Sequence, residues 1–230
     1  MVARLIVAGT HSGCGKTTVA TGLMAALAAA GLRVTGFKAG PDFIDPSYHA
    51  LACGRPGRNL DAFLSGPELI GPLVAHGAAG CDVAVVEGVM GLHDGRAGAG
   101  EEASTAQVAK LLAAPVLLVV DARSMARSAA ALVLGFRDFD PAVRVAGVVL
   151  NGVASDRHEA MLRDALAPLG IPVVGAIRRV PEIELVSRHL GLVPAAEEPR
   201  RVGALVERIG SVVASSLDLE LVLRLARSAP

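Results

Sequence analysis

The hydrophobic pattern along the chain switches repeatedly between two periods. Short runs rich in valine, isoleucine and leucine alternate with longer segments whose apolar residues recur at helical spacing. The short runs predict strands at residues 4–8, 34–37, 83–87, 116–121, 145–150 and 173–177. The longer segments predict helices at residues 17–30, 67–75, 104–112, 125–136 and 156–169, with one or two more within 202–227. This alternation is typical of a three-layer α/β fold, in which helices cover both faces of a mostly parallel, twisted sheet.

The composition is that of one large globular domain. Hydrophobic residues make up 52% of the 230 residues, charged residues make up 19%, and the formal net charge is +0. A neutral chain has no overall field that would attract nucleic acid or an anionic membrane, so we expect neither as a partner. We expect residues 1–194 to form the main body of the domain and residues 195–230 to add C-terminal helices to it.

Two further features bear on the cellular compartment of the protein. The longest mostly apolar run, residues 19–32, is too short to span a bilayer. The 3 cysteines show no metal-binding spacing, which favours a reducing compartment over a disulfide framework. We therefore expect a cytoplasmic protein.

A glycine-rich stretch, Gly-Thr-His-Ser-Gly-Cys-Gly-Lys-Thr-Thr, occupies residues 9–18, between the first predicted strand and the first predicted helix. That setting is typical of a phosphate-binding loop, whose backbone N–H groups surround an anion at the positive end of a helix. Lys16 would reach the β- and γ-phosphates of a nucleoside triphosphate, and the Thr17 hydroxyl would bind Mg²⁺. The predicted nucleotide-binding residues are Thr10, His11, Ser12, Gly13, Cys14, Gly15, Lys16, Thr17 and Thr18.

The loop departs from the usual pattern at one position. That pattern has a glycine six residues before the lysine, where this chain has Thr10; Gly9 lies one residue earlier. His11 stands where the ATPases that position septa and partition DNA carry a second lysine, which disfavours that class of switch. Cys14 reads as a loop residue rather than as a nucleophile.

Polar residues recur where the predicted strands end. In an open parallel sheet, ligands bind beyond the carboxyl ends of the strands. Lys38 follows the second predicted strand, Glu87 ends the third, Asp121 ends the fourth, and Asn151 follows the fifth. We expect these side chains at the same edge as the phosphate loop, with Asn151 at the nucleotide.

Three carboxylates on these segments are candidate ligands. A strand-terminal carboxylate facing a phosphate loop is the expected place for a Mg²⁺ ligand, which favours Glu87; alternatively, Glu87 caps the next turn. Asp42 and Asp45 lie on a predicted loop punctuated by prolines, where either could bind metal or substrate, or could form an Asx-turn. Lys38 could neutralise charge on a transferring phosphoryl group.

Basic side chains on the two long predicted loops could hold substrate carboxylates, although for each an ordinary solvated role is equally open. They are His49, Arg55, Arg58, His93 and Arg96.

Five longer blocks of sequence point to a particular protein family. They are Gly-Phe-Lys-Ala-Gly-Pro-Asp-Phe-Ile-Asp-Pro-Ser-Tyr-His at 36–49, Asn-Leu-Asp at 59–61, Glu-Gly-Val-Met-Gly-Leu-His-Asp-Gly at 87–95, Ser-Thr-Ala-Gln-Val-Ala-Lys at 104–110 and Arg-His-Leu-Gly-Leu at 188–192. Together they resemble cobyrinic (or hydrogenobyrinic) acid a,c-diamide synthase, in order from the first predicted strand to about Pro194. The Gly-Pro-Asp and Glu-Gly-Val-Met-Gly blocks are specific. The phosphate loop alone is similar to a wider P-loop group that includes dethiobiotin synthetase.

This resemblance implies an ATP- and Mg²⁺-dependent ligase that amidates the a and c carboxylates of a corrin ring. A ring carboxylate would attack the γ-phosphate to give an acyl phosphate, and ammonia would then displace phosphate. Carried over by motif, Lys16, Thr17, Asp45 and Glu87 would hold ATP and Mg²⁺, and Lys38, Asp42, Asp45 and Asp94 would carry the catalysis. The residues that would meet the macrocycle are Tyr48, His49, Arg58, His93 and Arg96.

Full-length members of that family carry a glutaminase half, with a cysteine nucleophile, that releases ammonia. None of Cys14, Cys53 and Cys81 lies in the Gly-x-Cys-x-Gly turn that such a nucleophile needs. We therefore expect a glutaminase domain or chain outside these residues, which alone would use free ammonia but not glutamine. By analogy with the fold group we also expect a homodimer.

Three other functions stay open. One is amidation of another modified tetrapyrrole, such as a nickel sirohydrochlorin. Another is a dethiobiotin-synthetase-like carboxylase, which the Gly-Pro-Asp block disfavours. The third is a partitioning-type ATPase switch, which His11 and the neutral charge disfavour.

Overall fold

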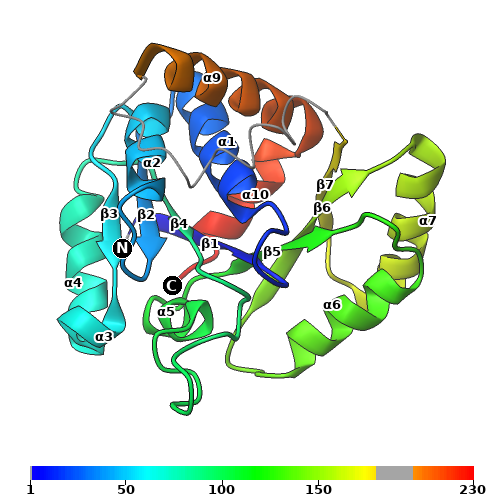
Figure 1. Cartoon of the computed structure of the whole chain (residues 1–230), viewed down its shortest axis with the longest axis horizontal. Helices are drawn as coiled ribbons and strands as arrows, with labels where there is room; N and C mark the ends of the chain where they lie inside the picture. The colour runs from blue at the N-terminus through cyan, green and yellow to red at the C-terminus, as the bar shows by residue number, and fades with distance from the viewer. Residues whose placement is uncertain (1, 180–198) are drawn as a thin grey trace.

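The computed structural model describes residues 2–179 and 199–230 (Figure 1). The block at residues 188–192 and the expected boundary at Pro194 lie outside the described residues.

Within the described residues, the strands form one 7-stranded parallel sheet in the order β3-β2-β4-β1-β5-β6-β7. The strands span Ala3–Gly9 (β1), Val34–Ala39 (β2), Arg58–Leu60 (β3), Val83–Glu87 (β4), Val116–Asp121 (β5), Val145–Val153 (β6) and Val173–Arg178 (β7). The predicted parallel α/β fold is therefore confirmed, and every predicted strand is present. The apolar pattern missed β3, because Leu60 is the only apolar residue in its Arg-Asn-Leu sequence.

Helices cover both faces of the sheet (Figure 1). On one face lie α1 (Lys16–Ala29), α2 (Asp45–Cys53), α9 (Pro199–Ser216) and α10 (Leu219–Arg227). On the other face lie α3 (Ala62–Ser65), α4 (Pro67–Gly77), α5 (Thr105–Leu111), α6 (Ser128–Asp138) and α7 (Asp156–Leu166). The chain thus has the three layers that its pattern predicts.

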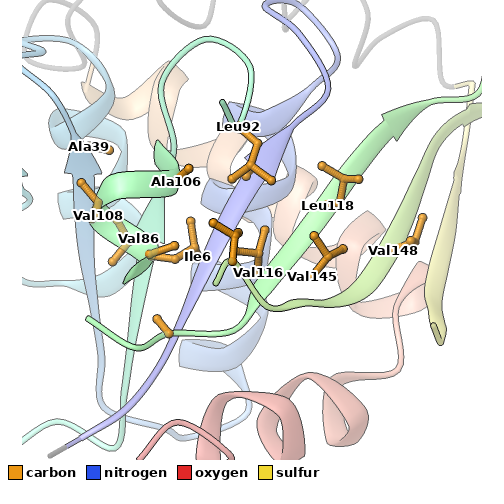
Figure 2. Packing of buried hydrophobic residues seen from close by; sticks show 14 of the residues in the cluster. Ile6, Ala39, Val86, Leu92, Ala106, Val108, Val116, Leu118, Val145 and Val148 are labelled. Atoms are coloured by element: carbon orange, nitrogen blue, oxygen red, sulfur yellow. The ribbon is translucent and has the colours of Figure 1, made fainter. Parts of the chain in front are cut away.

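The core consists of two apolar clusters separated by the sheet. Successive strand residues point to opposite faces, so β1 sends Ile6 into one cluster and Leu5 into the other. Figure 2 shows the first cluster, in which Ile6 lies among residues of neighbouring strands and of α5, including Val86, Val116 and Ala106. Burial on both faces explains why the strands read as continuous apolar runs.

The structure corrects the expected course of residues 42–53. Asp42 does lie on a loop, but Asp45 is the first residue of α2, which continues to Cys53. Pro46 stands in the first turn of this helix, where its missing N–H costs no hydrogen bond. The prolines that we interpreted as loop punctuation therefore include a helix-start signal.

The helix ends differ from the prediction by at most two residues except in two helices, where one end differs by three. The helix predicted at residues 125–136 spans Ser128–Asp138 in the structure, and Ser124, which precedes the predicted start, has a left-handed φ of 59°. The helix predicted at 156–169 ends at Leu166 and continues as a 3₁₀ turn, Ala167–Leu169. Pro168 has no N–H to continue the α-helical ladder there.

Strand β6 is longer than predicted and runs to Val153. Register shifts in its pairing with β7 lie between Val148 and Val149 and between Asn151 and Val153. These irregularities let pairing continue past the predicted end. Asn151 therefore lies within β6 rather than after it, opposite Asp121 at the end of β5.

Candidate active site

The phosphate loop connects β1 to α1 through glycines in the left-handed backbone region. Gly13 has φ 83° and Gly15 has φ 99°, values that a residue with a Cβ rarely adopts. Gly9 is needed for a different reason: a Cβ there would lie 2.2 Å from Cys14 Sγ and 2.8 Å from Lys16 Cγ. The close approach of Cys14 and Lys16 explains why glycine stands at position 9, while Thr10 replaces the usual loop glycine.

The amino end of α1 is suited to bind an anion. Among the described residues, no side chain caps this end, and its first turn carries no acidic residue. By contrast, Ser104, Ser155 and Asp218 cap α5, α7 and α10. Uncapped N–H groups at a helix start, behind a glycine turn, are free to bind phosphate oxygens. These residues therefore fit a nucleotide.

Lys16 completes this phosphate site. Its ammonium donates to the His11 carbonyl at 3.2 Å, which keeps it on the inside of the loop. The residue is 8% exposed, and burial lowers the pKa of Lys16, although nearby Cys14 raises it. A partly desolvated ammonium with one carbonyl partner can exchange that partner for phosphate oxygens.

Glu87 stands at the centre of the site, at the end of β4. It is 0% exposed, yet each carboxylate oxygen has partners. Oε1 accepts from the Thr17 hydroxyl at 2.5 Å and from Lys38 Nζ at 3.0 Å, and Oε2 pairs with His49 Nε2 at 2.7 Å. Burial by itself would raise the pKa of Glu87, but the charge of Lys38 and the hydrogen bonds from His49 and Thr17 together lower it well below its usual range. Glu87 therefore stays ionised.

Lys38 holds two carboxylates together. It lies opposite Glu87 in the β2–β4 register, and its ammonium donates to Asp45 Oδ2 at 2.5 Å, to Glu87 Oε1 at 3.0 Å and to the Gly88 carbonyl at 3.1 Å. Burial opposes its charge, but Glu87 and Asp45 raise the pKa of Lys38 above its ordinary value. Since these acceptors use all its N–H groups, contact between Lys38 and a phosphoryl group stays a prediction that requires an exchange of partners.

Asp45 is the weaker acid of the pair. Burial, followed by the charge of Glu87, raises the pKa of Asp45 to about 6, although Lys38 opposes this change. Two carboxylates that share one ammonium in a buried site repel each other, so the second is easier to protonate. A further cation at this position would relieve that repulsion.

The structure corrects the interpretation of His49 as a loop residue and places Tyr48 on the same helix. Both lie on α2 and are buried, with 2% and 0% of their surface exposed. Tyr48 belongs to the apolar cluster beneath α1, and burial raises its pKa. His49 contacts Glu87, a contact that sequence reasoning missed. The spacing of Asp45 and His49, one helical turn apart, could have indicated it once α2 was recognised.

Asp42 and Asp94 lie at the rim of the site. Asp42 Oδ1 accepts from the backbone N–H groups of Ile44 and Asp45, the Asx-turn that the sequence left open. Asp94 is exposed, and its Oδ2 accepts from Gly91 N at 2.8 Å. A Cβ on Gly91 would lie 2.5 Å from that oxygen and 3.1 Å from the Thr10 carbonyl, so Asp94 is close to the phosphate loop.

Grooves open on either side of the loop that follows β4. One, of about 340 Å³, is lined by Thr10, Asp94, His93 and the α6 residue Phe136, with Phe139 beyond that helix. The His93 ring stacks on Phe136 at 5.7 Å between centroids.

The other groove, of about 420 Å³, is lined by Pro41, Phe63, Leu64, Met90 and Arg96, among others. The guanidinium of Arg96 lies 5.1 Å from the centre of the Phe63 ring. Sequence reasoning found the basic residues of these loops but missed the apolar residues beside them, because exposed apolar side chains carry no motif.

Arg58 and Asn151 differ in whether they reach the phosphate loop. Arg58 begins β3, and its guanidinium donates to the Pro56 carbonyl, so the structure does not bring it to the phosphate loop. Asn151 Nδ2 donates to the Cys14 carbonyl at 2.9 Å, and a Cβ on Gly15 would lie 2.1 Å from that nitrogen. Asn151 thus contacts the back of the loop, while its contact with a nucleotide stays a prediction.

A metal ion here would need ligands besides protein carboxylates. In residues 2–179 and 199–230, no group of three or more His, Cys, Asp and Glu side chains could hold a metal ion. Mg²⁺ commonly binds through one or two carboxylates, a threonine hydroxyl, water and the phosphates of a nucleotide. Thr17, Glu87 and Asp45 fit that kind of site.

A parallel sheet, a glycine loop leading into an uncapped helix, and a buried acid on the adjacent strand define a P-loop nucleotide-binding protein. The chain belongs to the CobQ/CobB/MinD/ParA nucleotide binding domain family, whose model matches residues 5–193.

Curated relatives share high identity with nearly the whole chain. A protein of Streptomyces coelicolor named hydrogenobyrinate a,c-diamide synthase is 64% identical over 99% of this chain and 47% of its own length. The Thermobifida fusca protein of the same name is 55% identical over 99% of this chain and 48% of its own. A Synechococcus protein named cobyrinate a,c-diamide synthase is 48% identical over 85% and 43%. The chain spans about half the length of the curated relatives that it matches.

Solved structures share the fold at low identity. The MinD cell division protein of Aquifex aeolicus matches with a TM-score of 0.58 and 16% identity, over 100% of this chain and 98% of that one. The septum site-determining protein MinD of Pyrococcus horikoshii, complexed with Mg-ADP, matches at 0.52 and 17%, over 91% and 95%. Across the described residues, no helix has both the length and the apolarity needed to cross a bilayer.

Proposed function

We propose that this chain is the ATP-dependent synthetase part of a hydrogenobyrinate a,c-diamide synthase. The observation that carries the proposal is the 64% identity to the Streptomyces coelicolor protein of that name, which extends over 99% of this chain. Relatives named for hydrogenobyrinate reach 64%, 57%, 55% and 46% identity, whereas those named for cobyrinate reach 48% and 41%, so the most similar of these relatives carry the hydrogenobyrinate name. These identities favour the cobalt-free ring as the substrate.

The amidation of each carboxylate would have two steps. Both would take place at the edge of the sheet where β4 ends in Glu87. In the first, an oxygen of the ring carboxylate attacks the γ-phosphorus of ATP; ADP leaves, and an acyl phosphate forms. In the second, ammonia attacks the acyl carbon, phosphate leaves with the C–O bonding pair, and the nitrogen loses its extra proton. Phosphorylation supplies the leaving group that a carboxylate lacks, and the protein contributes positioning and neutralisation of charge.

The buried cluster fits the first step. Lys16 and the amino end of α1 would bind the phosphates, and Thr17, Glu87 and Asp45 would hold Mg²⁺, which supplies positive charge at the phosphoryl oxygens. Lys38 already lies between Asp45 and Glu87. It would steady the phosphoryl group if the bound metal took over one of those carboxylates.

The rim of the site fits a large, flat substrate with several carboxylates. The grooves lined by Phe63, Leu64 and Met90 and by Phe136 and Phe139 offer apolar surface to a macrocycle, and Arg96 offers a cation for a peripheral carboxylate. Asp94 would act at the carboxylate that reacts, or on the entering ammonia. Asp42 would support the same step from the loop before α2.

Ammonia would come from a glutaminase in the part of the relatives that this chain does not match. Residues 1–194 would form the amidoligase body, and the helices after it would lead toward that second part. In support, α9 and α10 pack on α1 and β1 as part of the same core cluster. The homodimer stays a prediction.

The test is to incubate the chain with ATP, Mg²⁺ and either ammonia or glutamine, with hydrogenobyrinic or cobyrinic acid, and to follow mass and phosphate release together. We expect diamide formation from hydrogenobyrinic acid with ammonia, matched by ADP, and no product with glutamine. Lys16→Met is the matched inactive control. Phosphate release that neither acid stimulates, with no amide formed, would refute the proposal.

A further inference from the structure

Helix α2 sends two side chains into the buried cluster. Asp45 and His49 are four residues apart and therefore lie on the same face of the helix, one turn from each other. Asp45 accepts from Lys38, whereas His49 contacts the other carboxylate, Glu87. The helix is thus attached to the end of β4 at two points, one through an ion pair and one through a histidine.

The contact between His49 and Glu87 is specific for one nitrogen and one oxygen. Nε2 lies 2.7 Å from Glu87 Oε2, and both side chains are 0% exposed. Since Glu87 Oε1 accepts from the Thr17 hydroxyl and from the Lys38 ammonium, we assign the carboxylate as the acceptor in this contact too, and Nε2 as the donor. The other ring nitrogen, Nδ1, is buried and has no hydrogen-bond partner within the described residues. The ring therefore acts through Nε2.

The bond from His49 determines how Glu87 is oriented. With Oε2 held by the imidazole, Oε1 faces Thr17 at 2.5 Å and Lys38 at 3.0 Å. Without it, the carboxylate could rotate part of the way about its last side-chain bond, and Oε1 would lose its alignment with Thr17. A buried carboxylate that lacks one of its donors also costs free energy, which favours such a rearrangement.

The backbone of β2 is shaped to admit this imidazole. A Cβ on Gly36 would lie 2.7 Å from His49 Cβ, 3.1 Å from His49 Cγ and 2.8 Å from Met24 Sδ. Glycine within a strand commonly marks such a close approach. The strand therefore has glycine, with no side chain, at the position where the His49 ring packs.

We propose that His49 is a positioning residue: it holds Glu87 Oε2 so that Oε1 faces Thr17, the hydroxyl that would share a Mg²⁺ ion with Glu87. The inference rests on the proposed function only in that a Mg-nucleotide is the ligand. It replaces the expectation that His49 contacts the macrocycle, because a fully buried ring cannot reach a substrate at the rim. It also gives α2 a role in metal binding that does not depend on Asp45.

Substitutions can distinguish the role of Nε2 from that of Nδ1. In His49→Gln, the side-chain amide nitrogen lies at the reach of Nε2, whereas in His49→Asn it lies only at the reach of Nδ1. The control is His76→Gln, at an exposed position near the end of α4. For each purified chain, ADP affinity is measured by calorimetry with and without Mg²⁺, and Mn²⁺ binding to the ADP complex is measured by electron paramagnetic resonance.

We expect His49→Asn to weaken Mn²⁺ binding and the Mg²⁺-dependent gain in ADP affinity by about 10–100-fold, the usual effect of losing a hydrogen bond to a metal ligand. His49→Gln should recover most of that loss, and ADP affinity without Mg²⁺ should stay the same in both. Equal behaviour of the Asn and Gln variants, or an equal loss with and without Mg²⁺, would overturn the proposal.

A second variant protects the test against misfolding at position 49. Gly36→Ala keeps the imidazole but displaces it, so it should reproduce the loss of Mg²⁺-dependent affinity. Gly71→Ala, where a Cβ meets nothing within 4 Å, is its control. Unchanged metal binding in Gly36→Ala would count against the proposal. These readouts involve no tetrapyrrole, so the amidation could fail while the role of His49 stands, and the reverse.

Discussion

Two ion pairs lie at opposite ends of the same two strands. Arg33 and Asp82 immediately precede β2 and β4, and Arg33 Nη2 lies 2.7 Å from Asp82 Oδ1. Lys38 and Glu87 lie near the other ends of these strands, with Nζ 3.0 Å from Oε1. The side chains of the first pair are 65% and 37% exposed, and those of the second pair are 6% and 0% exposed. The strand register is the same for both, so burial is the main difference.

Burial changes what a carboxylate does in these two regions. At the exposed end, hydrogen bonds from the Arg33 side chain and backbone lower the pKa of Asp82 to about 2. At the buried end, desolvation opposes the charge of Glu87, but Lys38, His49 and Thr17 together lower the pKa of Glu87 below its usual range. Desolvation, followed by the charge of Glu87, then raises the pKa of the neighbouring Asp45 to about 6, even though Lys38 is in contact with it. Water screens the interaction between Arg33 and Asp82, whereas the repulsion between Asp45 and Glu87 is screened much less because both are buried. Two buried carboxylates that share one ammonium in this way are suited to receive a divalent cation.

The largest contrast should come from removing the cation of each pair. Lys38→Met would leave Asp45 and Glu87 buried together without the ammonium that contacts both, and breaking a buried pair in this way costs about 3–5 kcal/mol of unfolding free energy. Arg33→Met should leave the unfolding midpoint unchanged within error, because its pair is exposed. Urea unfolding followed by circular dichroism measures both. Equal midpoints for the two variants would mean that burial does not distinguish the pairs.

The next contrast comes from neutralising the strand-associated acids. Glu87→Gln should reduce Mg²⁺-dependent ATP turnover by at least about 100-fold, because it removes a charge that would bind the metal and align Thr17. Asp82→Asn should leave turnover unchanged. Phosphate release measured over a Mg²⁺ titration tests this. If extra Mg²⁺ restored full activity to Glu87→Gln, Glu87 would serve only to attract the ion.

The smallest effect concerns a single proton and is measured on the wild-type chain, with variants used only to assign the signals. In nucleotide-free protein labelled with ¹³C at aspartate carboxyl groups, Asp45 should titrate near pH 6 and Asp82 near pH 2. Asp45→Asn and Asp82→Asn assign the two signals. Addition of Mg-ADP should move the Asp45 titration to lower pH, because a nearby cation favours the carboxylate.

The pKa shifts of Asp45 and Asp82 change the pH dependence of the unfolding free energy in opposite directions. The folded pKa of Asp45 lies above its ordinary value of 3.8, so its contribution is full below pH 3.8 and is lost as the pH rises through about 6. The folded pKa of Asp82 lies below 3.8, so its contribution is present above that pH and is lost as the pH falls through about 2. If Asp45→Asn and the wild type lost stability in parallel between pH 4 and pH 6, Asp45 would not be the group that titrates.

The predictable part of the fold is the part with a strong local signal. The β1 run, the glycine loop and the first turn of α1 follow each other in sequence, and each is specified by its own residues. The apolar pattern also found the β4 strand with its correct bounds and the acid at its end. Helix α2 was missed because its Asp-Pro start resembles a turn, and β3 because three residues carry too little pattern.

The sequence by itself determined the sheet, the phosphate loop and the set of residues that reach its carboxyl edge. Periodicity and glycine positions are local properties, and parallel strands bring their ends to one edge whatever their order. The tertiary structure alone decided which of these residues meet. It paired His49 with Glu87 across 38 positions, enclosed Lys38 between two acids, and turned Arg58 away. Those outcomes depend on strand order, register and burial, which arise from contacts between segments that are distant in the chain.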